Sequence, residues 1–487
     1  MSRQLKSRRW QGIVKGVCAL VVSVFSLCPT VWANENVPYD TYTYDYFEDI
    51  KYTPAAYAPE ETIKGDKWGI GALSNPQDLN ITSDGEIYIA DTGNNRIVVL
   101  DSKFKLLRVI DHFEMDGKEE TFNGPSGVYI SLNGDLYIAD TGNFRVVELN
   151  EKDELVKVIE NPQSEVLEEG FVFAPLKVAV DYADRVYVIA KNMFQGIMAF
   201  DSEGNFTGFT GKIEVEITTT EKIWRRFSTK AQRARQQLFI PTEFTGMEID
   251  DDGFIYATSI DAEGKQSIRR LNPKGQDVIV KKGVDGTLSG DKDWRLTGDY
   301  SGASRIIDVV VRDKGIYSMI DSTRGRIFTY DHEGNLLYIF GGIGTQEGTF
   351  KAPSAIEALG DKILVLDSGQ NAILSFGATR YGALINEAIS YRYDGDESKA
   401  VECWKEVIKL DSNFELAYVG IGKAYLSGGE NRKAMDYFKL GMDREYYSVA
   451  FKRYRNEFLK RNLQYVLSAV VILAIVGMIR SRRRAHE

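Results

Sequence analysis

Residues 87–101 read IYIADTGNNRIVVLD, and residues 136–150 read LYIADTGNFRVVELN. Both stretches have a short hydrophobic run on either side of an Asp-Thr-Gly-Asn turn, with an arginine five residues after the aspartate. Short hydrophobic runs bounded by turn residues predict β-strands, and the turn residues predict a reversal between them. Because the near-copy recurs after 49 residues, the sequence predicts a repeat protein built from β-sheets.

The start of the third strand of each unit can be followed along the chain, at successive spacings of 49, 51, 71, 59 and 46 residues. Four-stranded propeller blades recur every 40–50 residues or so, and the two longer spacings leave room for insertions. The chain is therefore expected to be mostly β, with a six-bladed β-propeller over residues 70–379. The aligned positions are Arg96, Arg145, Gly196, Ser267, Arg326 and Ala372.

The phrases PSGVYI at 125–130 and LYIADTGNFRV at 136–146 resemble the NHL repeat family over about residues 70–377. The resemblance implies a six-bladed propeller, a fold that in some relatives carries zinc-dependent lyases and in others calcium-dependent lactonases. The aspartate and arginine of the family's pattern match Asp91 with Arg96, Asp140 with Arg145, and Asp321 with Arg326. Unit three departs from it with Lys191 and Gly196.

These acid–arginine pairs are interpreted as structural ties. An aspartate at a strand end and an arginine five residues on can bridge a hairpin and its neighbour through charge-assisted hydrogen bonds. Unit six keeps Asp367 but has Ala372, and it lacks a fourth strand. The N-terminal segment 34–69 is expected to supply that strand and close the ring. The tyrosine-rich stretch Tyr39–Tyr52 is the predicted closing strand.

The two ends of the chain are basic, so the body between them is more acidic than the net charge of −10. An acidic body argues against nucleic acid as a partner. Residues 1–33 combine a basic head, an apolar run and Val31-Trp32-Ala33, which predicts a signal peptide cleaved after Ala33. An uncleaved anchor and a lipoprotein at Cys28 are the alternatives.

Residues 463–479 form an apolar stretch followed by a basic tail at 480–487, which predicts one transmembrane helix. Together with the signal peptide, the tail predicts a single-pass plasma-membrane protein with extracytoplasmic N-terminal domains and a cytoplasmic C-terminus. A buried C-terminal helix is the alternative.

A basic insertion, residues 213–240, separates units three and four. It contains six basic residues and no acidic one between 222 and 235, and a helix there would place Trp224 opposite arginines. One interpretation is an amphipathic element that docks on anionic lipid, cell-wall polymer or an acidic partner. The other is a solvated helical lid. The binding candidates are Lys222, Trp224, Arg225, Arg226, Lys230, Arg233 and Arg235. A second insertion, Gly283–Ser304, is expected to be a loop.

From Tyr381 the hydrophobic period changes to that of a helix. Two units superimpose at a spacing of 34 residues and resemble a pair of tetratricopeptide repeats over residues 380–445. A juxtamembrane helix at 446–462 is expected to cap them. A spacer role and a protein-docking role both remain open. The matched residues are Tyr391, Gly395, Ala400 and Trp404 with Tyr425, Gly429, Ala434 and Phe438.

Catalytic motifs are not apparent. The three histidines, His112, His332 and His486, are far apart in the repeat pattern, so a three-histidine zinc site is not expected. Neither a metal site nor a cofactor is predicted. The acidic run Asp250–Gly253 is interpreted as a hairpin turn, with a calcium site as the alternative.

These observations predict a membrane-anchored extracytoplasmic binding or scaffold protein with other membrane or envelope proteins as partners. An accessory subunit of a membrane transport complex is one such role. The alternative function is a metal-dependent lyase or hydrolase in the propeller channel.

Overall fold

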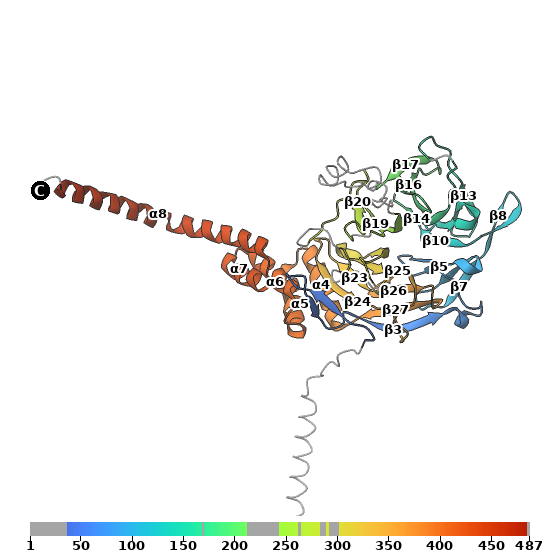
Figure 1. Cartoon of the computed structure of the whole chain (residues 1–487), viewed down its shortest axis with the longest axis horizontal. Helices are drawn as coiled ribbons and strands as arrows, with labels where there is room; N and C mark the ends of the chain where they lie inside the picture. Colours follow the sequence, from blue (N-terminus) through green and yellow to red (C-terminus); the bar gives the residue numbers. More distant parts are fainter. Residues whose placement is uncertain are drawn as a thin grey trace, which may run out of the picture. The chain divides into compact units, whose positions relative to one another are not determined.

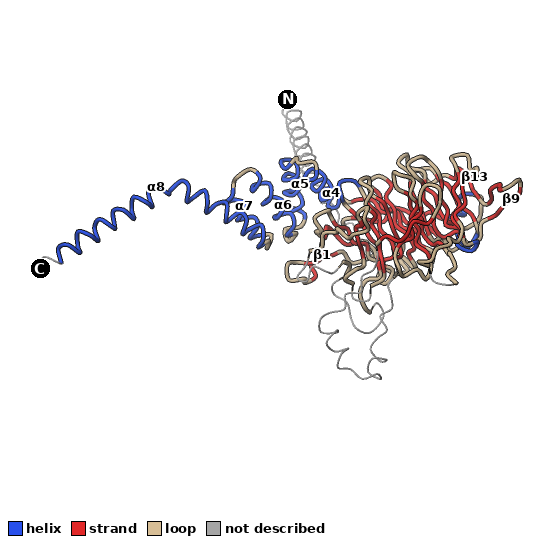
Figure 2. Tube along the Cα trace, turned by 90° about the horizontal axis from the view of Figure 1, so that it is seen from above, coloured by secondary structure: helices blue, strands red, loops and turns tan. Residues whose placement is uncertain are grey.

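The computed structural model describes residues 37–167, 170–211, 243–261, 264–282, 289–291 and 301–484. In this part of the chain, six antiparallel sheets form the blades of a β-propeller, and helices follow them (Figure 1). Figure 2 shows the strands gathered in one body, with α4 (Arg380–Tyr393) beginning at its edge. The predicted fold class of a six-bladed propeller followed by a helical region is confirmed in this form.

Blades one to three each have four strands in sequence order from the centre outward. A two-stranded hairpin, β8 (His112–Met115) and β9 (Lys118–Thr121), joins the first two blades. The strands of blade one are β4 (Asp78–Ile81), β5 (Ile87–Asp91), β6 (Arg96–Leu100) and β7 (Leu106–Ile110). Those of blade two are β10 (Pro125–Ile130), β11 (Leu136–Asp140), β12 (Arg145–Leu149) and β13 (Leu155–Ile159). Those of blade three are β14 (Pro175–Val180), β15 (Val186–Ala190), β16 (Ile197–Phe200) and β17 (Phe206–Thr210).

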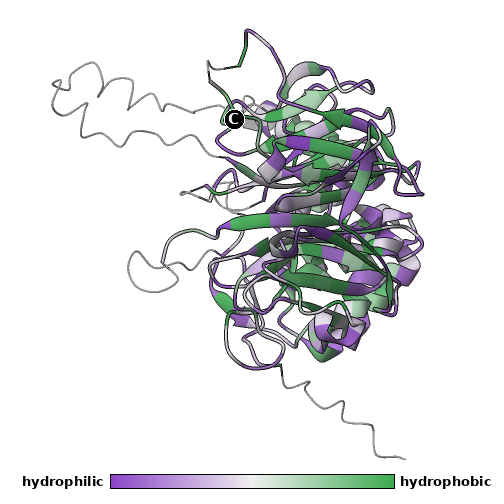
Figure 3. Ribbon diagram, turned by 90° about the vertical axis from the view of Figure 1, so that its right-hand side faces the viewer, coloured by the Kyte–Doolittle hydropathy of each residue, from purple (hydrophilic) through white to green (hydrophobic). Residues whose placement is uncertain are grey.

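Blades four to six follow the same order, and the second strand of every blade but the last is buried throughout its length. Figure 3 shows hydrophobic residues, coloured green, along many strands of the propeller. The described strands of blade four are β18 (Phe244–Ile249), β19 (Ile255–Ser259) and β20 (Ile268–Leu271). Blade five contains β21 (Ile306–Val311), β22 (Tyr317–Asp321), β23 (Ile327–Tyr330) and β24 (Leu336–Phe340). Blade six contains β25 (Pro353–Leu359), β26 (Lys362–Asp367) and β27 (Ala372–Ala378).

The N-terminal segment closes the ring, but with a different stretch from the one predicted. The outer strand of blade six is β3 (Tyr57–Lys64), which pairs antiparallel with β27 from Ala378 to Ala372. Pro59 lies where a bulge shifts the register, a position that tolerates the missing backbone donor.

The tyrosine-rich stretch expected to close the ring lies instead on blade five. There β1 (Tyr42–Tyr44) pairs with β24 and with β2 (Ile50–Tyr52). The hydroxyl of Tyr42 donates to Asp291 at 3.1 Å, and Tyr44 donates to the same carboxylate. The hairpin therefore anchors a described part of the second insertion.

The helices are α4, α5 (Glu397–Leu410), α6 (Glu415–Ser427), α7 (Asn431–Leu440) and α8 (Arg444–Arg484). Consecutive helices pack in pairs. Glycine in α6 permits this close approach, because a Cβ at Gly422 would lie 2.7 Å from the ring of Phe438. No single described helix is long and apolar enough to cross a membrane. The two halves of α8, Arg444–Tyr465 and Leu467–Arg482, meet the length and composition criteria together, although they are bent by 44°.

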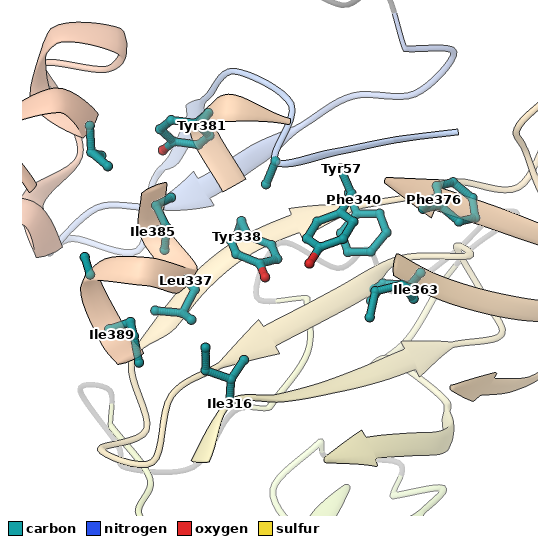
Figure 4. Close-up of a cluster of buried hydrophobic side chains, with 14 of the residues drawn as sticks. Tyr57, Ile316, Leu337, Tyr338, Phe340, Ile363, Phe376, Tyr381, Ile385 and Ile389 are labelled. Atoms are coloured by element: carbon teal, nitrogen blue, oxygen red, sulfur yellow. The ribbon is translucent and has the colours of Figure 1, made fainter. Parts of the chain in front are cut away.

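The first helix and the propeller share one hydrophobic core (Figure 4). Tyr381, Ile385 and Ile389 of α4 pack in the same buried cluster as Leu337 and Tyr338 of β24. The cluster continues through Trp404 of α5 into α6. Since large side chains from both parts are fully buried together, the propeller and the start of the helical region fold as one unit.

Candidate functional site

The Asp-Thr-Gly-Asn phrase connects strands within a blade and also connects neighbouring blades. Asp91 is fully buried, and it accepts hydrogen bonds from the backbone of Ser74 at 2.7 Å and from Arg96 at 2.7 Å. Thr92 donates to the carbonyl of Pro125 in blade two at 2.7 Å. The phrase thus satisfies backbone groups at the junctions that follow blades one and two.

Blade two repeats this arrangement, but blade five does not. Asp140 and Arg145 are 2.9 Å apart. In blade five, Asp321 is approached by Arg324 at 3.4 Å, and the predicted partner Arg326 donates to the carbonyl of Asp40 at 2.6 Å. Arg326 also donates to the carbonyl of Gly341 at 2.5 Å, so in blade five this arginine bonds backbone carbonyls and Arg324 takes its place beside the aspartate.

A ring of first strands lines the propeller axis. Strands β4, β10, β14, β18, β21 and β25 contact one another in turn, and β25 returns to β4. In each blade, one residue of the first strand pairs with the penultimate residue of the second strand. The six first-strand residues at this position form one level of the ring. They are Asp78, Gly127, Lys177, Gly246, Asp308 and Ala355.

Charged and small residues alternate around this first level. Lys177 of blade three forms ion pairs with Asp78 of blade one and, at 3.7 Å, with Asp308 of blade five. Blades one, three and five are not neighbours, so these ion pairs cross the channel. At the intervening position in blade four, a Cβ on Gly246 would lie 2.4 Å from Oδ1 of Asp308. The small residues therefore make room for the long ones.

The second level lies two residues further along each first strand. Large and small residues alternate around it in the opposite sense to the first level. Its larger polar residues belong to blades two, four and six, and Asn80 of blade one donates to Glu357 at 3.2 Å. The residues of this level are Asn80, Tyr129, Ala179, Glu248, Val310 and Glu357. The staggered levels fill the channel with four carboxyl groups and one lysine.

The channel carboxyl groups also bond to backbone donors of the next blade. Asp78 accepts from the amide of Val128 at 2.9 Å, and Asp308 accepts from that of Ile356 at 3.0 Å. The inner edge of a first strand has no partner strand, so these side chains satisfy its amides. This pattern gives the carboxyl groups a structural role at the axis.

Burial governs the protonation of the channel. It raises the pKa of Glu357 to about 8 and that of Asp308 to about 6, in both cases with help from neighbouring carboxylates. Burial also raises the pKa of Glu248 well above its ordinary value. The pKa of Lys177 is raised because Asp308 and Asp78 outweigh its own burial. One lysine cannot compensate four carboxylates, so the cluster retains protons near neutral pH.

A groove on the helices is the second candidate site. It has a volume of about 750 Å³ and lies between α4, α5, α6 and α7. Its apolar residues are Leu384, Ile408, Tyr418, Ile421, Tyr437 and Leu440. Residues of alternating charge line the α5 side of the groove, namely Glu402, Lys405, Glu406 and Lys409. Cys403 also lines it, and burial raises the pKa of this thiol to about 11.

Several predicted site residues lie outside the described part of the chain. These are the signal peptide and the basic insertion candidates Lys222, Trp224, Arg225, Arg226, Lys230, Arg233 and Arg235. Asp250 lies in a tight turn, where its carboxylate accepts from the amides of Asp252 and Phe254 and pairs with Arg270 at 2.6 Å. In the described residues, no group of three or more His, Cys, Asp or Glu side chains could hold a metal ion.

Two of the histidines are described, and they have separate surroundings. His112 is exposed beside Asp111, whereas His332 packs edge-on against Tyr393 of α4 at 5.2 Å between ring centroids. The channel residues were missed by sequence reasoning. Their position could have been found from the start of each first strand, because Asp78 and Lys177 each lie two residues after a proline.

Comparison with known proteins supports the repeat assignment. The NHL repeat profile matches residues 73–100 and 122–149, which cover much of blades one and two. No curated protein sequence matches the chain.

Solved structures with a similar fold include two lyases. Virginiamycin B lyase from Staphylococcus aureus is 14% identical, with a TM-score of 0.39, over 70% of this chain and 88% of that chain. A streptogramin B lyase is 13% identical, with a TM-score of 0.39, over 70% of this chain and 87% of that chain. These likenesses concern the fold alone.

Proposed function

We propose that this chain is a membrane-anchored extracytoplasmic scaffold that docks an apolar helical segment of a partner protein in the groove of its helical region. The groove is the observation that carries the proposal. Its apolar lining includes Leu440, whose side chain is 59% exposed. The occupant is a helix with one apolar face, since a groove bordered by α5 and α7 accepts a helix of that kind.

Charges on the border of the groove set the requirements for the occupant. Glu402, Lys405, Glu406 and Lys409 follow one another at helical spacings of three, one and three residues, so they lie along one side of α5. A partner helix that carries both charge signs beside its apolar face complements this border. The spacing of 34 residues between matched positions supports tetratricopeptide-like repeats, which use such surfaces.

The shared core gives the scaffold its rigidity. The side chain of Asn386 on α4 accepts from Tyr338 at 2.7 Å and donates to Tyr57 of the closing strand at 3.2 Å. Arg312 of the propeller donates to both tyrosine hydroxyls at 2.7 Å. A partner held in the groove is thus fixed with respect to the blades, which favours a scaffold over a flexible spacer.

The membrane anchor in this proposal is the apolar part of α8, residues 463–479. Its side chains are exposed, for example Leu473 at 70%. A row of exposed leucine, isoleucine and valine is costly in water and favourable in hydrocarbon. The basic residues after Ile479 support a cytoplasmic C-terminus in this proposal, and an accessory subunit of a membrane transport complex is a role of this kind.

Two measurements test the proposal. For the anchor, the wild type should resist alkaline carbonate extraction from membranes, whereas Leu473→Arg with Ile475→Arg should become extractable. Full extraction of the wild type would contradict the anchor.

For the groove, the intact protein is purified from its own membranes in mild detergent with its partner. Leu440→Glu should lose the partner and Lys439→Glu should retain it, because Lys439 lies about 100° around α7 from Leu440. Equal partner recovery from both variants would contradict docking in the groove.

A further inference from the structure

The turn between the third and fourth strands has the same backbone in blades one to five. Each turn has five residues. The amide of the first residue donates to the carbonyl of the fifth residue, and the amide of the fourth residue donates to the carbonyl of the first. The five turns therefore allow position-by-position comparison. They are residues 101–105, 150–154, 201–205, 272–276 and 331–335.

Blades one and two lack glycine at the fourth position of this turn, where blade two has Asp153 at φ 62°. Blades three, four and five have glycine there, with φ between 74° and 87°. Blade one has Phe104 at φ 59°. A left-handed backbone costs an aromatic residue roughly 1 kcal/mol relative to glycine. A bulky side chain at this strained position calls for an explanation beyond forming the turn.

Phe104 is part of a pocket at the junction of blades six and one. The pocket has a volume of about 390 Å³ and lies between β3, the short helix η1 (Gly65–Trp68) and the blade-one turn. The indole of Trp68 is held by a hydrogen bond of 2.9 Å from its nitrogen to the carbonyl of Phe104. The lining residues are Glu61, Ile63, Lys67, Trp68, Lys103, Phe104, Lys105 and Leu106.

The charge of this pocket is opposite to that of the protein. Lys67, Lys103 and Lys105 are exposed at its border, and none of them forms an ion pair with an acidic residue that the structure describes. The equivalent turn of blade two reads Asn-Glu-Lys-Asp-Glu. The three lysines outnumber Glu61, the one acidic residue of the lining, so the pocket attracts an anion.

The same turn position already serves as a docking point in blade five. There Glu333 pairs with Lys423 of α6 and, at 3.2 Å, with Arg392 of α4. Glu333 and Lys103 occupy the same third position of their turns. A charged side chain at this position can therefore bind a neighbouring group. Because blade one has a lysine where blade five has a glutamate, blade one selects an acidic group.

We propose that the pocket around Trp68 and Phe104 binds an acidic sugar unit of a uronic-acid polysaccharide. The aromatic side chains provide an apolar surface for the C–H face of a sugar ring. The lysines pair with its carboxylate, and Glu61 accepts hydrogen bonds from its hydroxyls. An acidic peptide matches the pocket less well because it has no sugar ring whose C–H face could cover Trp68 and Phe104.

Tetragalacturonate is the probe, titrated into the full-length protein in detergent micelles and followed by calorimetry. We expect saturable binding to the wild type and none to the neutral methyl ester of the probe. The double variant Lys103→Gln with Lys105→Gln should bind at least about tenfold more weakly. Phe104→Gly, which keeps the turn conformation, should also weaken binding.

Lys152→Gln, at the equivalent turn of blade two, is the matched control and should bind like the wild type. Thermal unfolding of each variant establishes that it is folded. Absence of binding by the wild type would overturn the proposal, as would equal affinity for the methyl ester. Tighter binding of an oligoglutamate peptide would assign the pocket to an acidic protein instead. None of these outcomes depends on the helical groove or the membrane anchor.

Discussion

Glu333 in the outer turn of blade five forms an ion pair with Lys423 of α6, whose side chain is only 5% exposed. The ammonium group of Lys423 also lies 4.5 Å from the ring centroid of Tyr446 at the start of α8. The contact thus joins the propeller, the middle of the helical region and the first turns of the helix proposed to enter the membrane. An ion pair so well buried depends on both partners.

Loss of this pair should weaken the attachment of the helices to the propeller. We predict that Lys423→Ala lowers the free energy of unfolding by about 2 kcal/mol, because it leaves the Glu333 carboxylate with fewer partners. Lys314→Ala removes an exposed ion pair with Asp394 that joins the same two parts at 2.8 Å, and it should cost less than about 1 kcal/mol. Chemical denaturation measures both, and equal losses would argue against a special role for Lys423.

The same contact should make the folding stability of the protein depend on pH. Burial raises the pKa of Glu333, but Lys423, Arg392 and Lys282 outweigh it, so that the pKa falls from 4.5 to about 2. A carboxyl group with a lowered folded-state pKa stabilises the protein above pH 4.5, and this stability is lost as pH falls toward 2. Melting temperatures at successive pH values should show that Glu333→Gln removes part of this decline. A decline of the same size in Glu333→Gln would contradict the pKa assignment.

The channel should show the opposite dependence. Burial and Asp308 raise the pKa of Glu357 from 4.5 to about 8, so its contribution is complete below pH 4.5 and is lost as pH rises through 8. We expect Glu357→Gln to raise the melting temperature at pH 9 and to leave it nearly unchanged at pH 4. The exposed Glu347→Gln is the control, and its difference from wild type should stay constant. A loss of stability at pH 9 in Glu357→Gln would contradict a protonated channel carboxyl group.

The closing strand should contribute far more stability than the hairpin before it. Deleting residues 37–64 removes β3 and leaves the edge of β27 open, so we predict a fall of roughly 10 °C or more in melting temperature. Deleting residues 37–52 removes β1 and β2 alone and should cost less. Calorimetry distinguishes the two deletions, and a larger effect of the shorter one would restore the tyrosine-rich stretch as the main closure.

The repeat architecture was predictable because blades one and two have nearly the same strand and turn residues and the other blades keep the spacing. The closing strand was assigned to the wrong residues for a physical reason. Tyr39–Tyr52 alternates like a strand, whereas Tyr57–Lys64 contains Pro59 and three consecutive polar or charged residues. An edge strand needs few apolar residues, so its sequence gave little signal.

The candidate sites were harder to predict than the blades. Asp78, Lys177 and Asp308 are single residues about 100 and 130 positions apart, and only the strand register brings them to one level. In blade five Asp321 pairs with Arg324, and Arg326 donates to the carbonyls of Asp40 and Gly341, an exchange of partners that the repeat pattern does not predict. The groove arises from the packing of four helices, so no short motif encodes it.

The most direct test of the scaffold proposal is site-specific photo-cross-linking in intact membranes. A photoreactive amino acid is placed at Leu440 in the groove or at Lys439 on the same helix but outside it. We predict one defined protein adduct from position 440 upon illumination and none from position 439. The same adduct from both positions, or none from either, would contradict a partner docked in the groove.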